Sequence, residues 1–311
     1  MQASNDQRAL LFALGAVLLW STVATAFKLS LQHLAPVQLL AWASMVSLLT
    51  LGTLLVATGR LGEVLRGSRR DDLRSLALGL INPLAYYLVL FEAYDRLPAQ
   101  EAQPLNYTWA FTLAILAMPL LGHRLTRWDV TGGLVAYAGV WVIATRGEVF
   151  ALEFANPAGV ALALGSTVLW ALYWIYSTRD RRDPLVALFC NFALGLPFVL
   201  LACALTAGLH VPDWRGLAGA AWVGVFEMGL AFALWLSALK LTTSASRISN
   251  LIFLSPFLSL FFIRTFVGET ILPSTWIGLG LIVTGLAVQQ SLRQRPERVG
   301  SDQRSRPSGK M

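Results

Sequence analysis

The sequence predicts an all-α integral membrane protein with ten transmembrane helices, arranged as two inverted repeats of five helices. The first observation is composition, because 56% of the residues are hydrophobic and 13% are charged, whereas soluble proteins carry about 25% charged residues. The second is the recurrence of apolar runs of about 20 residues, the length that crosses a bilayer as a helix. The third is an internal duplication: residues 162–170 (LALGSTVLW) repeat residues 12–20 (FALGAVLLW) with five of nine positions identical.

The first repeat, residues 8–146, follows a polar N-terminus at residues 1–7. Its first apolar run is too long for a signal peptide, and no small-residue cleavage site follows, so we expect a membrane helix. Pro36 suits the first turn of the second helix, because a proline there removes no helical hydrogen bond. A strongly basic loop then precedes the third helix. The five predicted helices cover about residues 8–27, 36–58, 73–94, 99–121 and 128–144.

The second repeat, residues 157–291, follows a connection at residues 147–156. Pro157 and Pro184 again suit the first turns of helices. Residues 292–311 are basic and rich in Arg, Ser and Pro, a composition typical of a disordered tail. The five predicted helices of this half cover about residues 157–177, 184–208, 217–239, 245–267 and 276–290.

The duplication extends beyond the opening residues of each half. Asn82 in the third helix aligns with Glu227 in the eighth at an offset of 145 residues. Three glycine pairs align at an offset of 146 residues: Gly122 with Gly268, Gly132 with Gly278, and Gly139 with Gly285. The small drift in offset is what differences in loop length produce. We therefore expect the two halves to share one five-helix fold.

The distribution of Lys and Arg predicts the orientation in the membrane. With a cytoplasmic N-terminus, 18 of the 24 basic residues fall on the cytoplasmic side, and the opposite side has five: Lys28, Arg96, Arg146, Arg215 and Arg264. This bias follows the positive-inside rule and predicts that both termini are cytoplasmic. Because five is odd, the two halves cross the membrane in opposite senses. Inverted repeats of this kind are typical of secondary transporters, whose substrate site lies between the repeats near the midplane.

The residues exclude several functional classes. We find no Ser/His/Asp, Cys/His or paired-acid arrangement and no Gly-rich phosphate loop, so we expect neither an enzyme nor a bound cofactor. His33, His123 and His210 fall near the ends of predicted helices and predict no metal site. The net charge of +7 arises in short loops and the tail, so it does not indicate nucleic-acid binding. Cys190 and Cys203 lie about 20 Å apart along one helix, which excludes a disulfide between them.

Polar and aromatic side chains within the apolar helices are the candidates for a substrate site, because a bilayer tolerates charge only against a cavity or a partner. Helical spacing places several of them on common faces, above all in the fourth and sixth helices. Glu227 either lines a cavity or hydrogen-bonds a neighbouring helix, and the aromatics either bind substrate or pack between helices. The predicted substrate-binding residues are Trp20, Asn82, Tyr86, Gln103, Asn106, Tyr107, Trp109, Trp170, Tyr173, Trp174, Glu227 and Asn250.

Three prolines interrupt apolar helices near their middles, where each removes a backbone hydrogen bond and can kink the helix. They are Pro83, Pro197 and Pro256 in the third, seventh and ninth helices. Arg247 lies about two turns from the cytoplasmic end of the ninth helix, from which its side chain can reach the interface. We assign these four residues a gating or structural role.

Together these motifs carry a resemblance. The Leu-Gly-x-x-x-Leu-Trp opening of both halves and the closing residues Gly268, Glu269, Gly278 and Gly285 resemble the drug/metabolite transporter superfamily, EamA type. Within it, the chain is most similar to the YddG-type exporters of aromatic amino acids. The first half departs from the closing pattern at His123, where the family more often has Glu. The resemblance implies a multi-pass protein of the bacterial inner membrane that acts on a small molecule, surrounded by lipid and monomeric.

The predicted function is export of aromatic or other neutral amino acids, or of related small amphipathic metabolites, by alternating access through a central cavity. Aromatic faces and amides suit such a solute, whereas only Arg247 and Lys28 could balance an anionic phosphate ester. A multidrug or other metabolite exporter of the same fold is one alternative, and a channel or facilitator without alternating access is another. Coupling is open between proton antiport through Glu227 and facilitated export down a gradient.

Overall fold

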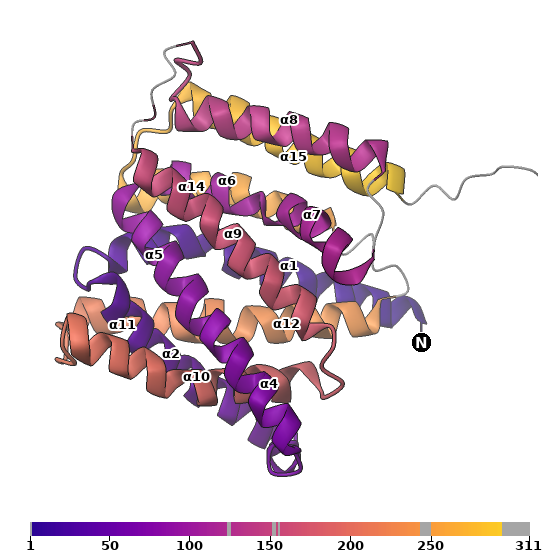
Figure 1. The fold of residues 1–311 in the computed structure, drawn as a ribbon, viewed down its shortest axis with the longest axis vertical. Helices are drawn as coiled ribbons and strands as arrows, with labels where there is room; N and C mark the ends of the chain where they lie inside the picture. The colour runs from indigo at the N-terminus through magenta and orange to yellow at the C-terminus, as the bar shows by residue number, and fades with distance from the viewer. Residues whose placement is uncertain (1, 123–125, 151–153, 155, 243–249, 294–311) are drawn as a thin grey trace, which may run out of the picture.

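The computed structural model describes residues 2–122, 126–150, 154, 156–242 and 250–293, and all secondary structure in these residues is helical (Figure 1). The predicted fold class is confirmed to that extent. The first half contains α1 (Gln2–Ser30), α2 (Pro36–Ala57), α3 (Leu61–Val64), α4 (Arg69–Gly79), η1 (Leu80–Ala85), α5 (Tyr86–Arg96), α6 (Ala99–Tyr107), α7 (Trp109–Leu121) and α8 (Arg127–Ala144).

The described part of the second half begins with a similar order, two long helices followed by a helix interrupted at an η segment. It contains α9 (Pro157–Ser177), α10 (Pro184–Thr206), α11 (Trp214–Trp222), η2 (Val223–Leu230), α12 (Ala231–Leu241), η3 (Asn250–Phe253), α14 (Leu254–Phe262), η4 (Ile263–Val267) and α15 (Pro273–Arg293). Pro36, Pro157 and Pro184 each lie in the first turn of a helix, as predicted. Asp183 and Asn156 precede two of these helices and accept hydrogen bonds from backbone N–H groups of the first turn.

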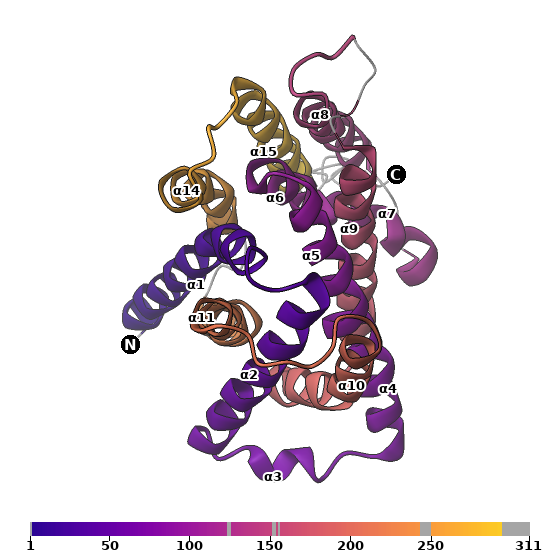
Figure 2. The same cartoon turned by 90° about the vertical axis from the view of Figure 1, so that its left-hand side faces the viewer.

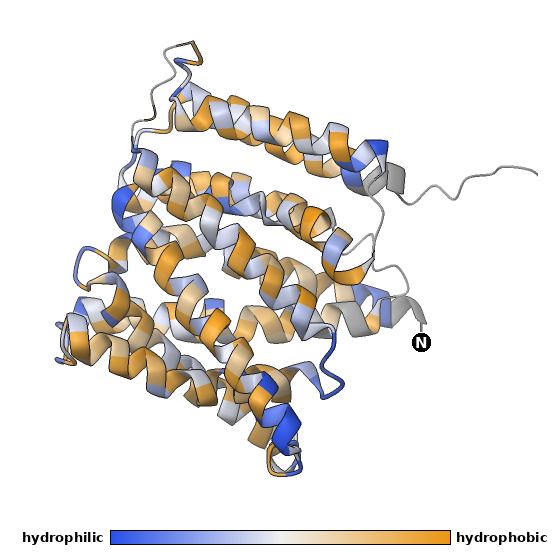
Figure 3. Ribbon diagram, in the orientation of Figure 1, coloured by the Kyte–Doolittle hydropathy of each residue, from blue (hydrophilic) through white to orange (hydrophobic). Residues whose placement is uncertain are grey.

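Seven helices in the described residues are long and apolar enough to cross a membrane, and two shorter apolar helices cover Leu251–Val267 and Pro273–Gln289. Apolar residues cover most of the length of the helices, and polar residues gather at their ends (Figure 3). α8 spans 18 residues and corresponds to the predicted fifth span. The start of the predicted ninth span, residues 245–249, lies outside the described residues. The number of ten spans stays a prediction.

Helix breaks occur at corresponding places in the two halves. The third predicted helix is divided by a kink in η1 between α4 and α5, and the eighth by the π-helical segment η2 between α11 and α12. Asn82 lies in η1 with φ −143° and ψ 112°, which is not helical, directly before Pro83. Glu227 lies in η2. The two residues aligned by the duplication therefore both lie where a membrane helix departs from regular α-helical geometry.

The packing of one half is repeated in the other. α1 of the first half packs on α12 and α14 of the second half. In the same way, its counterpart α9 of the second half packs on α5 and α7 of the first half. α8 and α15 lie side by side (Figures 1 and 2). They are antiparallel, because Gly132 faces Gly285 and Gly139 faces Gly278. At each of these four glycines an added Cβ would come within 3.0 Å of the facing glycine's carbonyl oxygen, so the absence of a side chain permits the close approach.

α2 and α10 form a second pair of corresponding helices, and they too are antiparallel. At one end the side chain of Gln38 donates to the carbonyl oxygen of Gly208 (3.1 Å), just after α10. At the other end Leu55 packs with Val186 and Cys190 near the start of α10. In Figure 1 the N-terminus and the end of α15 lie on the same side of the bundle. We call this side the inner end and the opposite side the outer end.

Candidate functional site

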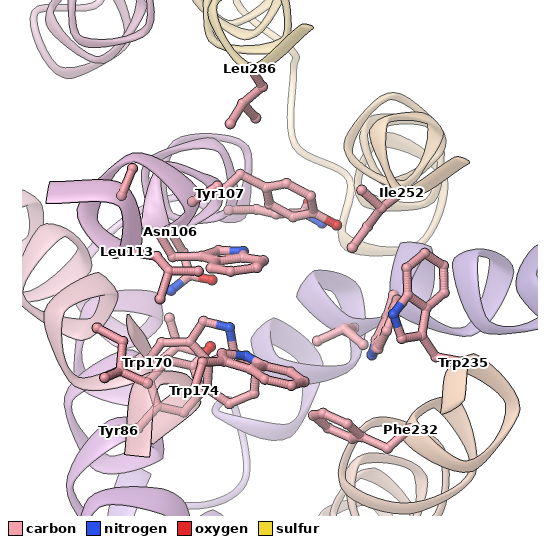
Figure 4. Close-up of a pocket in the computed structure, with 18 of the residues that line it drawn as sticks. Tyr86, Asn106, Tyr107, Leu113, Trp170, Trp174, Phe232, Trp235, Ile252 and Leu286 are labelled. Atoms are coloured by element: carbon pink, nitrogen blue, oxygen red, sulfur yellow. The ribbon is translucent and has the colours of Figure 1, made fainter. Parts of the chain in front are cut away.

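A cavity of about 570 Å³ lies at the centre of the helix bundle (Figure 4). Side chains of α1, α5, α6, α7, α9, η2, α12, η3 and α15 line it, so both halves of the chain contribute. Nine of the twelve predicted substrate-binding residues are part of this lining: Trp20, Tyr86, Gln103, Asn106, Tyr107, Trp109, Trp170, Trp174 and Glu227.

One wall of the cavity is built around Trp170 on α9. Its ring stacks on Tyr86 of α5, with ring centroids 4.5 Å apart and planes inclined by 26°. Trp109 and Trp174 meet the same ring edge to face at 6.5 Å and 5.8 Å. Trp170 is only 9% exposed, since these neighbours cover much of it. Stacked and edge-to-face rings of this kind fix one another's orientation.

A second group of rings comes from α1 and α12. Trp20 lies 5.9 Å from Phe232 and 5.3 Å from Trp235, measured between ring centroids. Phe232 in turn lies 6.0 Å from Trp170, which joins the two groups into one aromatic wall. Figure 4 shows Trp235 across the cavity from Asn106 and Leu113. The wall offers π-faces to a ligand from several directions.

Glu227 is the acidic residue of the described lining, and it reaches the cavity from η2. Its Oε1 accepts a hydrogen bond from the hydroxyl of Tyr87 at 3.3 Å. Its Oε2 is buried and has no hydrogen-bond partner within the described residues. Tyr87 packs on Tyr86 with ring centroids 4.9 Å apart, so the carboxylate lies at the edge of the aromatic wall.

The amides of α6 are tied to neighbouring helices. Asn106 donates from Nδ2 to the Ser166 hydroxyl of α9 at 2.9 Å. Gln103 accepts through Oε1 from the Ser259 hydroxyl of α14. The indole N–H of Trp174 lines the same cavity and, within the described residues, has no acceptor. The lining therefore contains polar groups that are already paired and two fully buried atoms, on Glu227 and Trp174, that have no partner within the described residues.

Some predicted residues lie elsewhere. Asn82 and Tyr173 are outside the cavity lining, because they face the neighbouring helices; the Tyr173 hydroxyl accepts from Asn191 of α10 at 3.3 Å. The side chain of Asn250 and the whole of Arg247 lie outside the described residues, as does His123. Pro197 lies within α10, and Pro256 lies in the first turn of α14, where a proline is tolerated.

The sequence reasoning missed several lining residues. Phe232 and Trp235 lie three residues apart on α12. The i, i+3 spacing that identified the rings of α9 would also have placed these two on one helix face. Tyr94, Phe27 and Gln289 also line the cavity. They lie near helix ends, where an aromatic or amide is typical of the membrane interface, so position alone did not separate them from anchoring residues.

A hydrogen-bond network closes the outer end of the bundle. The carboxylate of Glu269 accepts from the backbone N–H of Ala99 at 2.7 Å and of Gln100 at 3.1 Å, at the N-terminus of α6. The Gln100 side chain donates to the carbonyl of Thr270 at 2.9 Å and accepts from the N–H of Leu272 at 2.8 Å. We call these contacts, together with those of Lys28 and Arg146, the outer network.

Two basic residues complete the outer network. Lys28 of α1 donates to the carbonyl oxygens of Tyr94 (2.7 Å) and Leu97 (2.8 Å), where α5 ends. Arg146, just after α8, pairs with the buried carboxylate of Glu101 at 2.8 Å. Cations at the C-terminal end of a helix and carboxylates at an N-terminus both complement the helix dipole. The outer network therefore joins α1, α5, α6 and the segments after α8 and η4.

The two ends of the cavity differ in exposure. At the outer end the lining stops at Phe27 and Tyr94, which are 1% and 3% exposed and lie beneath the outer network. At the inner end the lining reaches Leu121, the last residue of α7, which is 37% exposed. The cavity therefore extends toward the inner end and is covered at the outer end.

Comparison with known proteins agrees with this architecture. The EamA-like transporter family matches residues 7–145 and again residues 157–289. The aromatic amino acid exporter YddG of Ancylobacter novellus is 28% identical over 240 residues, covering 73% of this chain and 78% of that protein. The uncharacterized transporter YvbV of Bacillus subtilis is 26% identical over 238 residues, covering 74% and 76%.

Two further similarities cover more of the chain. The probable terminal-alkyne amino-acid exporter of Streptantibioticus cattleyicolor is 27% identical over 255 residues, covering 78% of this chain and 82% of that protein. A solved crystal structure superimposes with a TM-score of 0.66 at 26% identity, covering 92% of this chain and 99% of the other. The helical architecture is thus found in an experimentally solved protein.

Proposed function

The chain belongs to the EamA-like transporter family and is a multi-pass membrane transporter, and from that premise we propose that it exports aromatic or other neutral amino acids, or related small amphipathic metabolites. The observation that carries this proposal is the central cavity, whose walls are aromatic and which contains one carboxylate in its described lining. The names of two relatives, an aromatic amino acid exporter and a probable terminal-alkyne amino-acid exporter, support the same substrate class.

The size and chemistry of the cavity suit such a solute. A volume of about 570 Å³ lies within the range of pockets that enclose small molecules. An aromatic side chain of the substrate can pack against the aromatic wall without a polar group being buried unpaired. The faces of these rings also attract an ammonium group. A multiply charged phosphate ester would find no such complement in the described lining.

Alternating access is the proposed mechanism. The antiparallel pairs α2·α10 and α8·α15, together with the repeated packing of α1 and α9, support two inverted five-helix repeats, residues 8–146 and 157–291. Within the described residues, the lining that reaches exposed Leu121 at the inner end and the covered outer end support an inward-facing state. Rocking of the repeats about the cavity would break the outer network and expose the substrate to the other side. The covered outer end favours this carrier mechanism over a channel.

Counterflow in proteoliposomes tests the proposed function. Vesicles are loaded with unlabelled tryptophan, and uptake of external radiolabelled tryptophan is followed over time. A carrier is expected to accumulate label transiently above equilibrium, with saturable, trans-stimulated exchange, and lysine or aspartate loaded in place of tryptophan should stimulate little. A linear, unsaturable flux would indicate a channel, and no exchange with any aromatic or neutral amino acid would contradict the substrate class.

A further inference from the structure

Two buried polar atoms in the described lining of the cavity have no hydrogen-bond partner in the described protein. One is Oε2 of Glu227, an acceptor, and the other is Nε1–H of Trp174, a donor. Buried polar groups in native proteins are nearly always paired, so each of these two atoms requires a partner or another physical explanation. Glu227 thus has an unengaged acceptor and Trp174 an unengaged donor, and both side chains line the cavity.

The balance of charge in the lining is uneven. Glu227 is its acidic residue, and the lining formed by the described residues includes no Lys or Arg. Lys28 is the basic residue in the last turn of α1, but its ammonium is already bound to the carbonyl oxygens of Tyr94 and Leu97. An ammonium group on a ligand therefore meets an opposite charge, whereas a carboxylate meets only neutral donors.

We propose that Glu227 binds the amino group of the substrate as an ion pair and that the Trp174 indole N–H donates to an uncharged or charged oxygen at the carboxyl position. This inference rests on the proposed function, because it assumes that the cavity binds the transported amino acid. It adds a rule of specificity: a free amino group is required, and an ionised carboxylate is not. Amino-acid amides and esters, and aromatic amines, are then substrates of the same site.

Four ligands with the same indole ring test this rule on the unmodified protein. Tryptophan, tryptophan amide, tryptamine and N-acetyltryptophan are compared as competitors of labelled tryptophan in counterflow. Tryptophan amide is expected to compete within about threefold of tryptophan. N-acetyltryptophan, which lacks the cationic amine, is expected to compete about 10–100-fold more weakly, the range that loss of a charged hydrogen bond gives.

Two variants assign the rule to residues. Glu227→Gln is expected to weaken tryptophan and its amide about 10–100-fold and to leave N-acetyltryptophan unchanged. Trp174→Phe keeps an aromatic ring and removes the donor, so it should weaken tryptophan and its amide about 2–10-fold while leaving tryptamine, which has no oxygen there, unchanged. Glu92→Gln and Trp222→Phe are matched controls, because Glu92 pairs with Arg96 and Trp222 donates to Thr22 outside the cavity lining.

The outcomes separate this inference from the proposed function. Equal competition by N-acetyltryptophan and tryptophan would overturn the rule while the protein remains an aromatic amino acid transporter. Competition by N-acetyltryptophan but not by the amide would overturn it in the same way, because the carboxylate would then be the recognised charge. Failure of tryptophan itself to exchange would overturn both. The ligand series alone decides the rule if either variant fails to fold.

Discussion

Trp170 is the residue through which most of the cavity wall is held together. It contacts Tyr86, Trp109, Trp174 and Phe232, which come from α5, α7, α9 and α12. Aromatic pairs contribute about 0.5–1.5 kcal/mol each beyond the area they bury. Removing this ring would change the shape of the aromatic wall and loosen the neighbouring rings.

Trp170→Ala is therefore expected to raise the KM for tryptophan by about tenfold or more, or to abolish exchange, because the rings that form the cavity wall lose their shared contact. Tyr107→Ala should also raise the KM for tryptophan. Saturation kinetics of counterflow measure both, and gel filtration in detergent checks that the variants remain monodisperse. Trp141→Phe is the control, because Trp141 donates to Val149 and packs on Phe154 away from the cavity lining. Wild-type kinetics in both alanine variants would mean that the rings only pack the bundle.

Among individual residues, the sequence identified those lining residues whose helical spacing placed them on one face of a helix. Gln103, Asn106 and Tyr107 on α6, and Trp170 and Trp174 on α9, line the cavity as the period of the helix predicts. Tyr173 shares a broad face with Trp170 and Trp174 yet lies outside the lining. The period gives a face about 100° wide and cannot tell which edge of that face meets α10 and which meets the cavity.

Among the elements, η1 and η2 interrupt two membrane helices at Asn82 and Glu227. A regular helix would have directed the side chains around these residues differently. A π-helical segment contains an extra residue per turn, which rotates the following helix and changes which side chains face inward. The sequence showed Pro83 in the third helix but gave no sign of the segment around Glu227, which contains no proline. The location of Phe232 and Trp235 after η2 was for that reason harder to predict than that of the rings on α9.

The outer network is the element that we expect to control access from the outer end. Glu269→Gln leaves one acceptor oxygen in place of the carboxylate at the N-terminus of α6. Loss of such a cap costs ~1 kcal/mol, which corresponds to about a fivefold shift between states. We expect the variant to open the outer end about fivefold more often.

Accessibility of a single cysteine measures this shift. Ala110 lines the cavity on α7, and Ala110→Cys in a background without Cys190 and Cys203 provides the reporter. A membrane-impermeant thiol reagent applied from the outer side should label it about fivefold faster in Glu269→Gln, and labelling from the inner side should fall. Glu92→Gln, also near the outer end of the bundle, is the control. If both variants label at the same outer rate, the outer network does not restrict access.

At the scale of the whole molecule, the duplication was the most informative part of the sequence. The resemblance to the EamA type is confirmed, and the family matches the two predicted halves separately. The aligned glycines Gly132 and Gly285, and Gly139 and Gly278, prove to be contacts between α8 and α15, which the alignment could not reveal because it relates equivalent positions and not neighbours. The Lys and Arg distribution predicts orientation, which awaits a sidedness measurement.

The end of the bundle toward which the cavity extends could not be read from the sequence. The two halves differ at one such point: Glu269 caps the start of α6, whereas the aligned position in the first half is His123, outside the described residues. Such differences shift an equilibrium between two packings of similar free energy, which composition and periodicity do not report. The structure supplies this information through the contrast between buried Phe27 and exposed Leu121.

The central claim is that the aromatic cavity is the transport site, and substrate protection of Ala110→Cys tests it most directly. In a variant that still exchanges tryptophan, saturating tryptophan is expected to slow labelling from the inner end by about tenfold, because the ligand fills the space beside the thiol. A cysteine at Gly62, in the exposed segment between α2 and α4, should label at one rate with or without ligand. Labelling of Ala110→Cys that is equally fast with and without tryptophan would contradict the account.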